Sequence, residues 1–346
     1  MSMRGRALLL HSVPGIRFTR ALSRWLPFLL LASAALPLCG RTIRHEGRTY
    51  TAVASLAKDF GMQSYWLKGE NLYRMRGSDT IVDVTPRSRL LRINSMPLYL
   101  GFPTIESKGQ LYLANADLSR ALRPILAPQR SGRIPNCRRI AIDAGHGGKD
   151  HGAINSAFGL SEKALSFDVA RRLQQLLLAA GFEVIQTRRE DRYLPLSQRP
   201  ERAKQRSADL FLSLHFNAAA SKTASGYETF ALTPQYQAST RYSKPSANDS
   251  TRFAGNRQDP WNVLLAYHIQ QELVRRMAGP DRGVKRARFK VLKELHCPGV
   301  LVEMGFMSHA PTAEKLCSAA HRQQLAQSLF DGIVAYRKRL QSIQFR

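Results

Sequence analysis

The chain has 346 residues, of which 52 are lysine or arginine and 25 are aspartate or glutamate, so its formal net charge is +27. Hydrophobic residues make up 44% of the chain, and only 4 residues are cysteine. These figures exclude a disordered tail, a polytopic membrane protein and a disulfide-stapled miniprotein, because the chain can bury a sizeable core. The charge points to a polyanionic partner, such as nucleic acid, an anionic membrane or an acidic cell-wall polymer, without choosing among them.

Residues 1–40 have the pattern of a secretory signal peptide with a long basic leader. Five arginines precede an apolar run from Trp25 to Leu38, no acid occurs before Glu46, and small residues suited to signal peptidase stand at 32–34. An uncleaved anchor is the alternative, but this run is short for a bilayer span. Cleavage removes five of the 27 charges and leaves +22. We therefore expect an exported protein, periplasmic or extracellular and associated with the cell wall, without a stable membrane span.

Four cysteines need an interpretation in an exported chain, because export permits disulfides. Cys297 and Cys317 flank one strand-loop segment and could form a bridge, which would leave Cys137 unpaired. Three buried free thiols are the alternative. Cys39 follows Leu38 rather than a small residue, which argues against lipidation.

A linker divides the remaining chain. Residues 123–139 contain three prolines, a glycine and five arginines without helical or strand periodicity. We expect a small accessory domain at 41–128, a linker at 129–138 and a larger domain at 139–340. In the first of these, periodicity predicts a helix within 50–60, strands at 81–84, 90–93, 98–100 and 111–113, and a turn at Asn94 and Ser95.

In the larger region, apolar runs of strand length alternate with segments of helical period. The expected elements are a strand at 140–143, a helix at 164–178, a strand at 182–187, a helix at 201–207, strands at 209–214 and 227–232, a helix at 262–277, a strand at 300–302 and a helix at 325–340. This alternation predicts an α/β fold, a three-layer sandwich with a mainly parallel sheet flanked by helices, preceded by the small α+β domain. Functional sites in such sheets lie beyond the carboxyl ends of the strands.

Chemically active residues stand at those ends. His146, His215 and Glu303 each follow or end an expected strand, and Glu162 stands at the start of the first helix. Two imidazoles and a carboxylate make the ligand set of a catalytic zinc site, and a second carboxylate could act as general base. Each residue alone also has a structural explanation, such as a helix-start carboxylate. Glu303 is the hardest to explain in this way, because it ends an apolar run where an unpaired charge is costly.

Several short motifs lie in order along residues 139–338. They are Ile142-Asp143-Ala144-Gly145-His146-Gly147-Gly148-Lys149-Asp150, Glu162-Lys163, Thr187-Arg188, Leu196-Ser197-Gln198-Arg199, Ser213-Leu214-His215-Phe216-Asn217-Ala218, Arg282-Gly283-Val284-Lys285 and Val302-Glu303-Met304-Gly305-Phe306-Met307-Ser308. In this order they resemble the zinc-dependent N-acetylmuramoyl-L-alanine amidases of the third amidase family.

The resemblance implies a role for each site residue. His146, Glu162 and His215 would bind one Zn²⁺, and Glu303 would be the catalytic acid/base. The implied reaction is hydrolysis of the amide between N-acetylmuramic acid and L-alanine of peptidoglycan stem peptides, in cell-wall remodelling or daughter-cell separation. Peptidoglycan is the implied partner, and an envelope activator protein is a further one that the resemblance allows.

Other residues are candidates for the walls of a substrate groove. Asn217, Asn256, Arg282 and Lys285 could bind the carboxylates of a stem peptide. For the residues around the third helix the alternative is a solvated cap and a charged surface. Some relatives insert a helix that plugs the zinc, but residues 233–255 are polar and turn-rich, so we expect an unplugged enzyme.

The segment from Ile93 to Leu118 loosely resembles the small domain named after the copper amine oxidase N-terminus. This resemblance implies a targeting or spacer module and no copper. Two other functional classes remain as alternatives: a catalytically silent cell-wall-binding protein on an amidase fold, and an exported nucleic-acid binder. The latter is disfavoured because the chain has no aromatics interleaved on a basic face, so we expect no nucleic-acid partner.

Overall fold

The computed structural model describes residues 41–344, which belong to one compact unit. The expected signal peptide at 1–40, including Cys39, lies outside the described residues. Between residues 41 and 344, no helix combines the length and the apolar character that crossing a bilayer requires. The boundaries of the accessory domain, the linker and the larger domain stay predictions.

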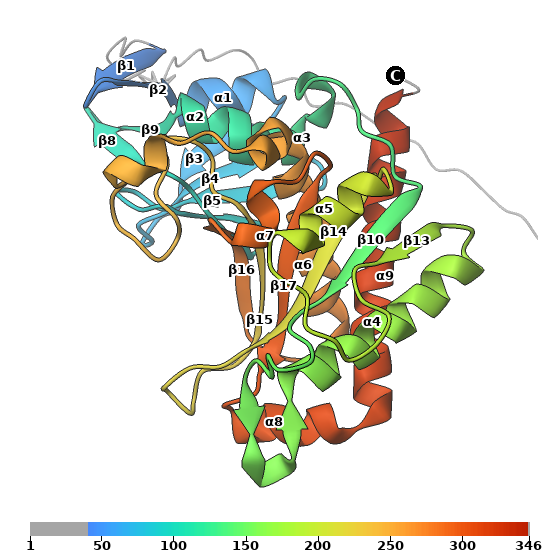
Figure 1. Cartoon of the computed structure of the whole chain (residues 1–346). Coiled ribbons are helices and arrows are strands. Elements are labelled where there is room, and N and C mark those ends of the chain that lie inside the picture. Colours follow the sequence, from blue (N-terminus) through green and yellow to red (C-terminus); the bar gives the residue numbers. More distant parts are fainter. Residues whose placement is uncertain (1–40, 345–346) are drawn as a thin grey trace, which may run out of the picture. The chain divides into compact units, whose positions relative to one another are not determined.

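Residues 41–130 form short strands and small helices (Figure 1). The elements are β1 (Thr42–His45), β2 (Arg48–Ala52), α1 (Val53–Asp59), β3 (Gln63–Trp66), β4 (Tyr73–Arg76), β5 (Ile81–Val84), β6 (Leu90–Ile93), β7 (Met96–Tyr99), β8 (Ile105–Ser107), β9 (Gln110–Ala114), α2 (Asn115–Asp117) and α3 (Arg123–Leu126). The expected turn joins β6 to β7, with positive φ at Asn94 (49°) and Ser95 (71°), as a tight hairpin of this kind requires. The four expected strands and the expected helix are present, but β1, β2, β3, β4 and β8 were not predicted, and β2 occupies the start of the range in which the helix was expected.

Residues 139–344 contain the alternating elements that the sequence predicts and further elements that it does not predict. They are β10 (Arg139–Ala144), β11 (Ile154–Asn155), β12 (Leu160–Ser161), α4 (Glu162–Ala179), β13 (Glu183–Gln186), α5 (Gln198–Gln205), β14 (Leu210–Asn217), β15 (Tyr227–Leu232), α6 (Asp259–Arg276), β16 (Asp281–Ala287), α7 (Lys290–Lys293), β17 (Gly299–Phe306), α8 (Ala310–Cys317) and α9 (Ala319–Gln344). Every element expected in this region is present, with boundaries that differ by a few residues, whereas β11, β12, β16, α7 and α8 were not predicted.

The principal sheet has the strand order β13-β10-β14-β17-β15-β16-β7-β6-β5-β4-β3. Strands β13, β10, β14 and β17 are mutually parallel, and β15 is antiparallel to β17. Strand β16 is parallel to both β15 and β7, and β7 to β3 form an antiparallel meander. The sheet is therefore mixed, and its parallel part carries the carboxyl ends at which a site was expected.

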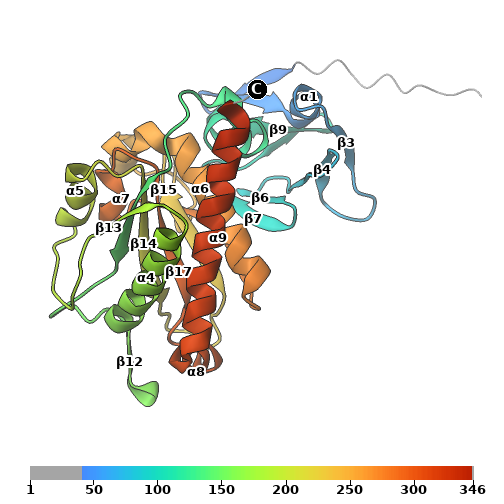
Figure 2. The same cartoon turned by 90° about the vertical axis from the view of Figure 1, so that its right-hand side faces the viewer.

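Helices cover both faces of the parallel part. Along β10, Ile140 and Ile142 pack in the same cluster as apolar residues of α4, α6 and α9, while Ala141 packs on the opposite face with residues of α5 and α7. Figure 2 shows α9 running along the sheet beside α4 and α6. Burial on both faces explains why β10, β14 and β17 read as continuous apolar runs rather than as alternating patterns.

Strand β16 differs from what the sequence predicted for this segment. The basic run that begins at Arg282 was interpreted as a groove wall or a charged surface, yet it forms an internal strand. Arg286 is only 2% exposed and donates a hydrogen bond to the carbonyl oxygen of Arg120 (2.7 Å). A guanidinium can be buried when oxygen atoms from another segment accept its N–H groups, and no local sequence pattern shows that such acceptors will be present.

A buried polar cluster joins the N-terminal region to the loop after β15. Asp117 accepts hydrogen bonds from the backbone N–H of Gly101 (2.7 Å) and from Gln237 Nε2 (3.3 Å). Arg89 donates to the carbonyl oxygen of Ala238 (2.8 Å). A Cβ atom at Gly101 would stand 2.4 Å from Gln237 Cδ, so this close approach needs a glycine. The loop is therefore held firmly against residues 89–117.

This cluster gives a pH-dependent prediction. Burial raises the pKa of Asp117 to about 6, although backbone N–H groups and Arg286 oppose the change. The folded state therefore binds this proton more tightly than the unfolded state does. Below about pH 4 the carboxyl is largely protonated in both states, so it does not lower the unfolding free energy. Between about pH 4 and about pH 6 the unfolded state releases the proton while the folded state keeps it, so the unfolding free energy falls as the pH rises. We expect the unfolding free energy of Asp117→Asn, relative to the unmodified chain, to rise by about 2–3 kcal/mol between pH 4 and pH 7.

Urea unfolding at pH 4, 5, 6 and 7 measures this difference. The exposed Asp79, replaced in the same way, is a matched control whose difference from the unmodified chain should not change with pH. Asp259, whose pKa burial also raises to about 6, titrates in all three proteins and cancels in the comparison. A difference for Asp117→Asn that stays constant over this range would contradict the prediction.

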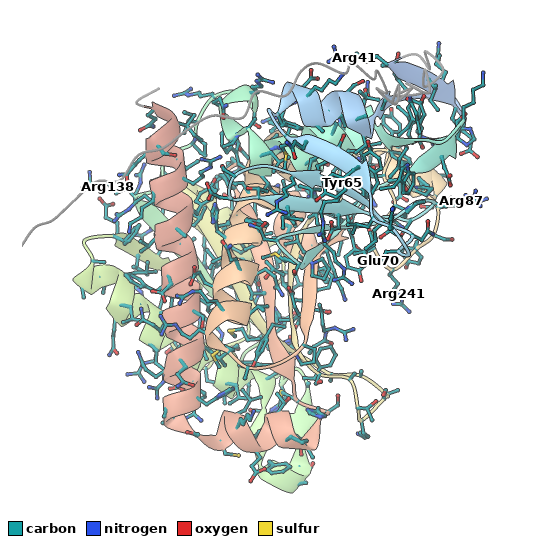
Figure 3. All side chains as sticks on the ribbon, turned by 180° about the vertical axis from the view of Figure 1, so that it is seen from behind. Arg41, Tyr65, Glu70, Arg87, Arg138 and Arg241 are labelled. Carbon is teal, nitrogen blue, oxygen red and sulfur yellow. The ribbon has the colours of Figure 1, made fainter. Side chains whose placement is uncertain are left out.

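The structure shows the state of the three cysteines that it describes. Cys137, Cys297 and Cys317 are free thiols, so the Cys297–Cys317 bridge does not form, and the alternative of three buried thiols fails because Cys317 is exposed. Much of the positive charge is exposed, as Arg41, Arg87, Arg138 and Arg241 show (Figure 3). Three other arginines are almost fully buried, namely Arg188, Arg199 and Arg286.

Candidate metal centre

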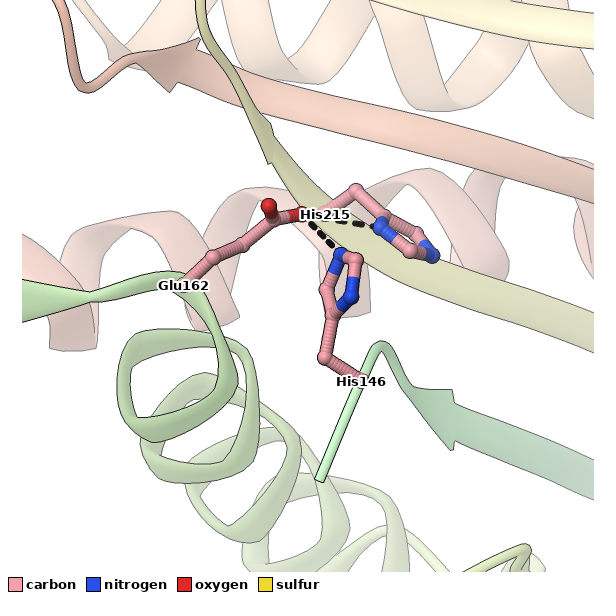
Figure 4. A group of neighbouring side chains, drawn as sticks. All are labelled: His146, Glu162 and His215. Carbon is pink, nitrogen blue, oxygen red and sulfur yellow. Dashed lines mark hydrogen bonds and ion pairs between the residues drawn. The ribbon is translucent and has the colours of Figure 1, made fainter. Parts of the chain in front are cut away.

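Three side chains that are distant in sequence converge at the carboxyl end of the parallel strands. His146 follows β10, Glu162 opens α4, and His215 lies near the end of β14 (Figure 4). Glu162 Oε1 lies 2.9 Å from His146 Nε2 and 2.9 Å from His215 Nδ1. One ligand atom from each side chain falls within 4.8 Å of the others, and this is the one such group of three found among residues 41–344.

Glycines make room for these side chains. A Cβ atom at Gly145 would stand 2.4 Å from the His215 ring, and one at Gly152 would stand 2.6 Å from Glu162 Oε2. His146 itself has a positive φ of 61°, in a turn that continues through Gly147 and Gly148. The glycine-rich sequence around His146 is therefore explained by the space and the backbone conformation that the cluster requires.

Hydrogen bonds behind His215 fix its tautomer. Ser213 Oγ donates a hydrogen bond to Asp143 Oδ2 (2.8 Å). The lone pairs of Ser213 Oγ can therefore accept a hydrogen bond from His215 Nε2 (3.1 Å). With a metal ion bound, the other ring nitrogen, Nδ1, would present its lone pair to the centre of the cluster. Behind His146, Asp150 Oδ1 lies 2.9 Å from Nδ1. Outer carboxylates of this kind orient the histidine ligands of metal sites.

Buried arginines hold the loop that carries His146. Arg199 donates to the carbonyl oxygens of Ala144 and His146 (both 2.9 Å), and its Nη1 lies 3.0 Å from Asp143 Oδ1. Arg188 donates to the carbonyl of Gly145 (3.0 Å). These bonds explain the Thr187-Arg188 and Arg199 motifs of the sequence, which position the backbone around the cluster rather than contacting it.

The charges of the cluster favour a cation. Burial alone would raise the pKa of Glu162, but hydrogen bonds and charge from both imidazoles hold its pKa well below the usual range. Burial would also lower the pKa of His146, and the carboxylates of Glu162 and Asp150 reverse this and raise it. A carboxylate with two imidazole nitrogens facing one point is a donor set that suits Zn²⁺. These residues therefore fit a zinc ion.

Glu303 lies in the same pocket. The pocket has a volume of about 290 Å³, and its lining includes His146, Glu162, His215, Asn217 and Glu303. In the parallel register of β14 and β17, His215 stands directly beside Glu303. Atom Oε2 of Glu303 is buried and has no hydrogen-bond partner in the described part of the chain. The sequence-predicted metal set and the predicted acid/base are thus brought together.

The environment of Glu303 favours its protonated form. Burial raises the pKa of Glu303 well above its ordinary value, and the negative charges of Glu162 and Glu228 raise it further. Lys285 acts in the opposite direction. A cation bound beside Glu303 would lower this pKa again, and a carboxyl group that titrates near neutral pH can both accept and return a proton, as a general acid/base must.

The four residues predicted to bind the stem peptide differ in their positions relative to the pocket. Asn217 lines the pocket, whereas Asn256 does not. The Asn256 amide is buried and donates to the Thr233 carbonyl (3.1 Å) and to Asp259 Oδ1 (2.9 Å), so it closes a turn before α6. The expected carboxylate-binding role does not suit this position.

Arg282 and Lys285 are already paired. Arg282 Nε lies 2.7 Å from Glu228 Oε2, and Lys285 Nζ lies 2.5 Å from the same oxygen. Asn217 Nδ2 donates to Glu228 Oε1 (2.8 Å). Sequence analysis missed Glu228, although the signal that identified Glu303, an acid within an otherwise apolar strand, was present in Tyr227-Glu228-Thr229-Phe230.

The segment 233–255 was expected to lack a plugging helix. It contains the 3₁₀ turns Ala247–Ser250 and the beginning of Ala254–Gln258, and none of its residues lines the pocket. Two arginines hold its first part: Arg288, which directly follows β16, donates to Gln237 O (2.9 Å), and Arg89 of the N-terminal region donates to Ala238 O (2.8 Å).

Comparison with known proteins gives a consistent match to the larger region. Residues 140–335 match the family described as N-acetylmuramoyl-L-alanine amidase. The N-acetylmuramoyl-L-alanine amidase LytC of Bacillus subtilis (strain 168) is 37% identical over 197 residues, which cover 57% of this chain and 35% of LytC. The uncharacterized protein YqiI of the same organism is 32% identical over 199 residues, covering 58% of this chain and 84% of YqiI.

Solved structures add a further match. A crystal structure of an N-acetylmuramoyl-L-alanine amidase from Clostridium difficile 630 is 28% identical, covers 59% of this chain and 98% of that chain, and has a TM-score of 0.48. The present chain spans about a third of the length of LytC.

Proposed function

Since its match to the N-acetylmuramoyl-L-alanine amidases extends from residue 140 to residue 335, this chain belongs to that family, and we propose that it is a zinc hydrolase of peptidoglycan. It would cleave the amide between N-acetylmuramic acid and the L-alanine that begins the stem peptide. One observation carries the proposal: His146, Glu162, His215 and Glu303, which come from four separate segments of the chain, line a single pocket.

The mechanism follows from the positions of these side chains. His146, Glu162 and His215 would hold the zinc ion, which when bound supplies Lewis acidity toward a carbonyl oxygen and a water molecule. Glu303 accepts a proton from the attacking water as the new C–O bond forms. It then donates this proton to the alanine nitrogen as the C–N bond breaks, because an amide nitrogen leaves poorly as an anion.

The remaining expectations extend this proposal. The chain would be exported to the periplasm or the cell exterior, bind peptidoglycan as its substrate, and act in wall remodelling or daughter-cell separation. Residues 41–128, which resemble the copper amine oxidase N-terminal-like domain, would serve as a targeting or spacer module. An activator protein would not need to displace a plugging helix, because segment 233–255 leaves the pocket lining free.

Digestion of purified peptidoglycan with the zinc-loaded chain, followed by mass spectrometry of the soluble products, tests the reaction. We expect free stem peptides that begin with L-alanine. Disaccharide-peptides or peptides cut internally would contradict the assignment of the scissile bond. Binding to peptidoglycan without any soluble product would support the alternative of a catalytically silent wall-binding protein.

A further inference from the structure

Glu228 is the meeting point of polar side chains from three strands. It lies in β15, and its side chain is 4% exposed. Its two oxygens accept hydrogen bonds from Asn217 of β14 and from Arg282 and Lys285 of β16. A buried carboxylate with three donors is firmly held, since each charge-assisted bond is stronger than a neutral one.

Glu228 also stands directly opposite Glu303. The antiparallel register of β15 and β17 pairs these two residues, so their side chains lie on one face of the sheet. Two carboxylates in this arrangement repel each other unless cations compensate, and Lys285 is near enough to Glu303 to lower its pKa. Because Glu303 Oε2 has no partner in the described residues, it is available as an alternative acceptor for the Lys285 ammonium.

The bond to Asn217 fixes the direction of its amide. An ionised carboxylate only accepts hydrogen bonds, so the group that faces Glu228 must be the NH₂ of Asn217. The carbonyl oxygen of this amide is then left as an acceptor on a residue that lines the pocket. A peptide substrate offers backbone N–H donors that such an oxygen can bind.

We propose that Glu228 is a positioning residue of the pocket that contains Glu303 and Asn217, an inference that rests on the proposed function. It keeps Lys285 away from Glu303, so that the acid/base carboxyl stays unpaired. It also turns Asn217 so that its carbonyl oxygen can accept a hydrogen bond from a substrate N–H. Glu228 itself touches neither the substrate nor the metal.

The replacement Glu228→Gln tests the first role. The amide keeps the size of the side chain but removes the charge that holds Lys285, whose ammonium then pairs with Glu303. We expect kcat on peptidoglycan to fall by about 100-fold. Bound zinc should stay at one per chain, and a crystal structure of the variant should show Lys285 Nζ within hydrogen-bonding distance of Glu303.

A second replacement should restore activity. In Glu228→Gln combined with Lys285→Met, the competing cation is absent, and we expect kcat within about tenfold of the unmodified chain. Arg282 remains, but its side chain is 36% exposed and can be hydrated. A merely structural role for Glu228 predicts the opposite, since two changes in one buried network should damage folding more than one.

The Asn217 role has its own readout. With Glu228 present, Asn217→Asp places two carboxylates face to face, so it should lower kcat/KM more than Asn217→Ala does. In the Glu228→Gln background the order should reverse, because the new amide can donate to Asp while the Asp oxygen still serves the substrate. An unchanged order would overturn this part of the proposal.

Asp168 provides a matched control. Its carboxylate accepts from Arg172 (2.9 Å) and Arg322 (2.5 Å) but lies outside the pocket lining, so Asp168→Asn should keep kcat within about threefold. Retention of kcat by Glu228→Gln, or no recovery in the double variant, would overturn the positioning role. If the unmodified zinc-loaded chain released no stem peptides, the proposed function itself would fail, and the Lys285 position in the variant crystal structure would still test the contact.

Discussion

Replacing Glu303 by Gln is expected to lower kcat for stem-peptide release by about 1000-fold while leaving one zinc ion bound per chain. Gln has the shape of Glu, but near neutral pH it cannot accept the proton of the attacking water or return one to the alanine nitrogen. Glu303 is also outside the group of three ligand atoms, so its loss should not release the metal. Product release measured by mass spectrometry and zinc measured by elemental analysis on one preparation separate the two effects.

An exposed carboxylate of the same region serves as control for this variant. Glu190→Gln removes a surface charge away from the pocket and should leave both kcat and zinc unchanged. If Glu303→Gln kept more than about a tenth of the activity, the general acid/base would have to be another group. If instead it lost its zinc, Glu303 would be part of the metal set.

Replacing His215 by Ala is expected to abolish both zinc binding and turnover. His215 Nδ1 faces the centre of the cluster and is one of only three donors there, so its loss leaves too few ligands for tight binding. The zinc dissociation constant should rise by more than the about 10- to 100-fold typical for loss of an outer partner. Titration with a competing chelator measures this constant without reference to activity.

Two further variants are expected to give an intermediate and an unchanged zinc affinity in the same titration. Ser213→Ala removes the oxygen that accepts from His215 Nε2, and we expect zinc affinity to fall by about 10- to 100-fold. The exposed His296 lies outside the pocket, so His296→Ala should bind zinc like the unmodified chain. Tight zinc binding by His215→Ala would show that the metal site is elsewhere.

The pattern of apolar and polar residues along the sequence was sufficient to predict most helices and strands near the site. Helix α4 was expected from apolar residues at helical spacing, and β10, β14 and β17 from short apolar runs between turn residues. His146 and His215 were singled out because they follow buried strands, and their convergence needed only the general property that parallel strands end at one edge of a sheet. Glu162 opens helix α4, and its assignment as the third ligand came from the family resemblance.

Strand β16 and Glu228 were not predicted, for a common reason. In sequence, Arg282, Lys285 and Arg286 look like a solvated basic segment, because an isolated cation is costly to bury. Their burial is possible only beside acceptors on other elements, such as Glu228 on β15 and the carbonyl of Arg120. Neither the neighbouring strands nor their register can be read from residues 281–287 alone.

The sequence by itself determined the order of the elements, the α/β class and the identity of the four residues that we assign to zinc and proton transfer, because apolar periodicity and ordered motifs are properties of the chain. The tertiary structure decided which polar atoms meet. It paired Arg282 and Lys285 with Glu228 rather than leaving them to a substrate, and it placed Asn217 in the pocket but not Asn256. Such pairings depend on strand order and register, which only the packing of the whole sheet establishes.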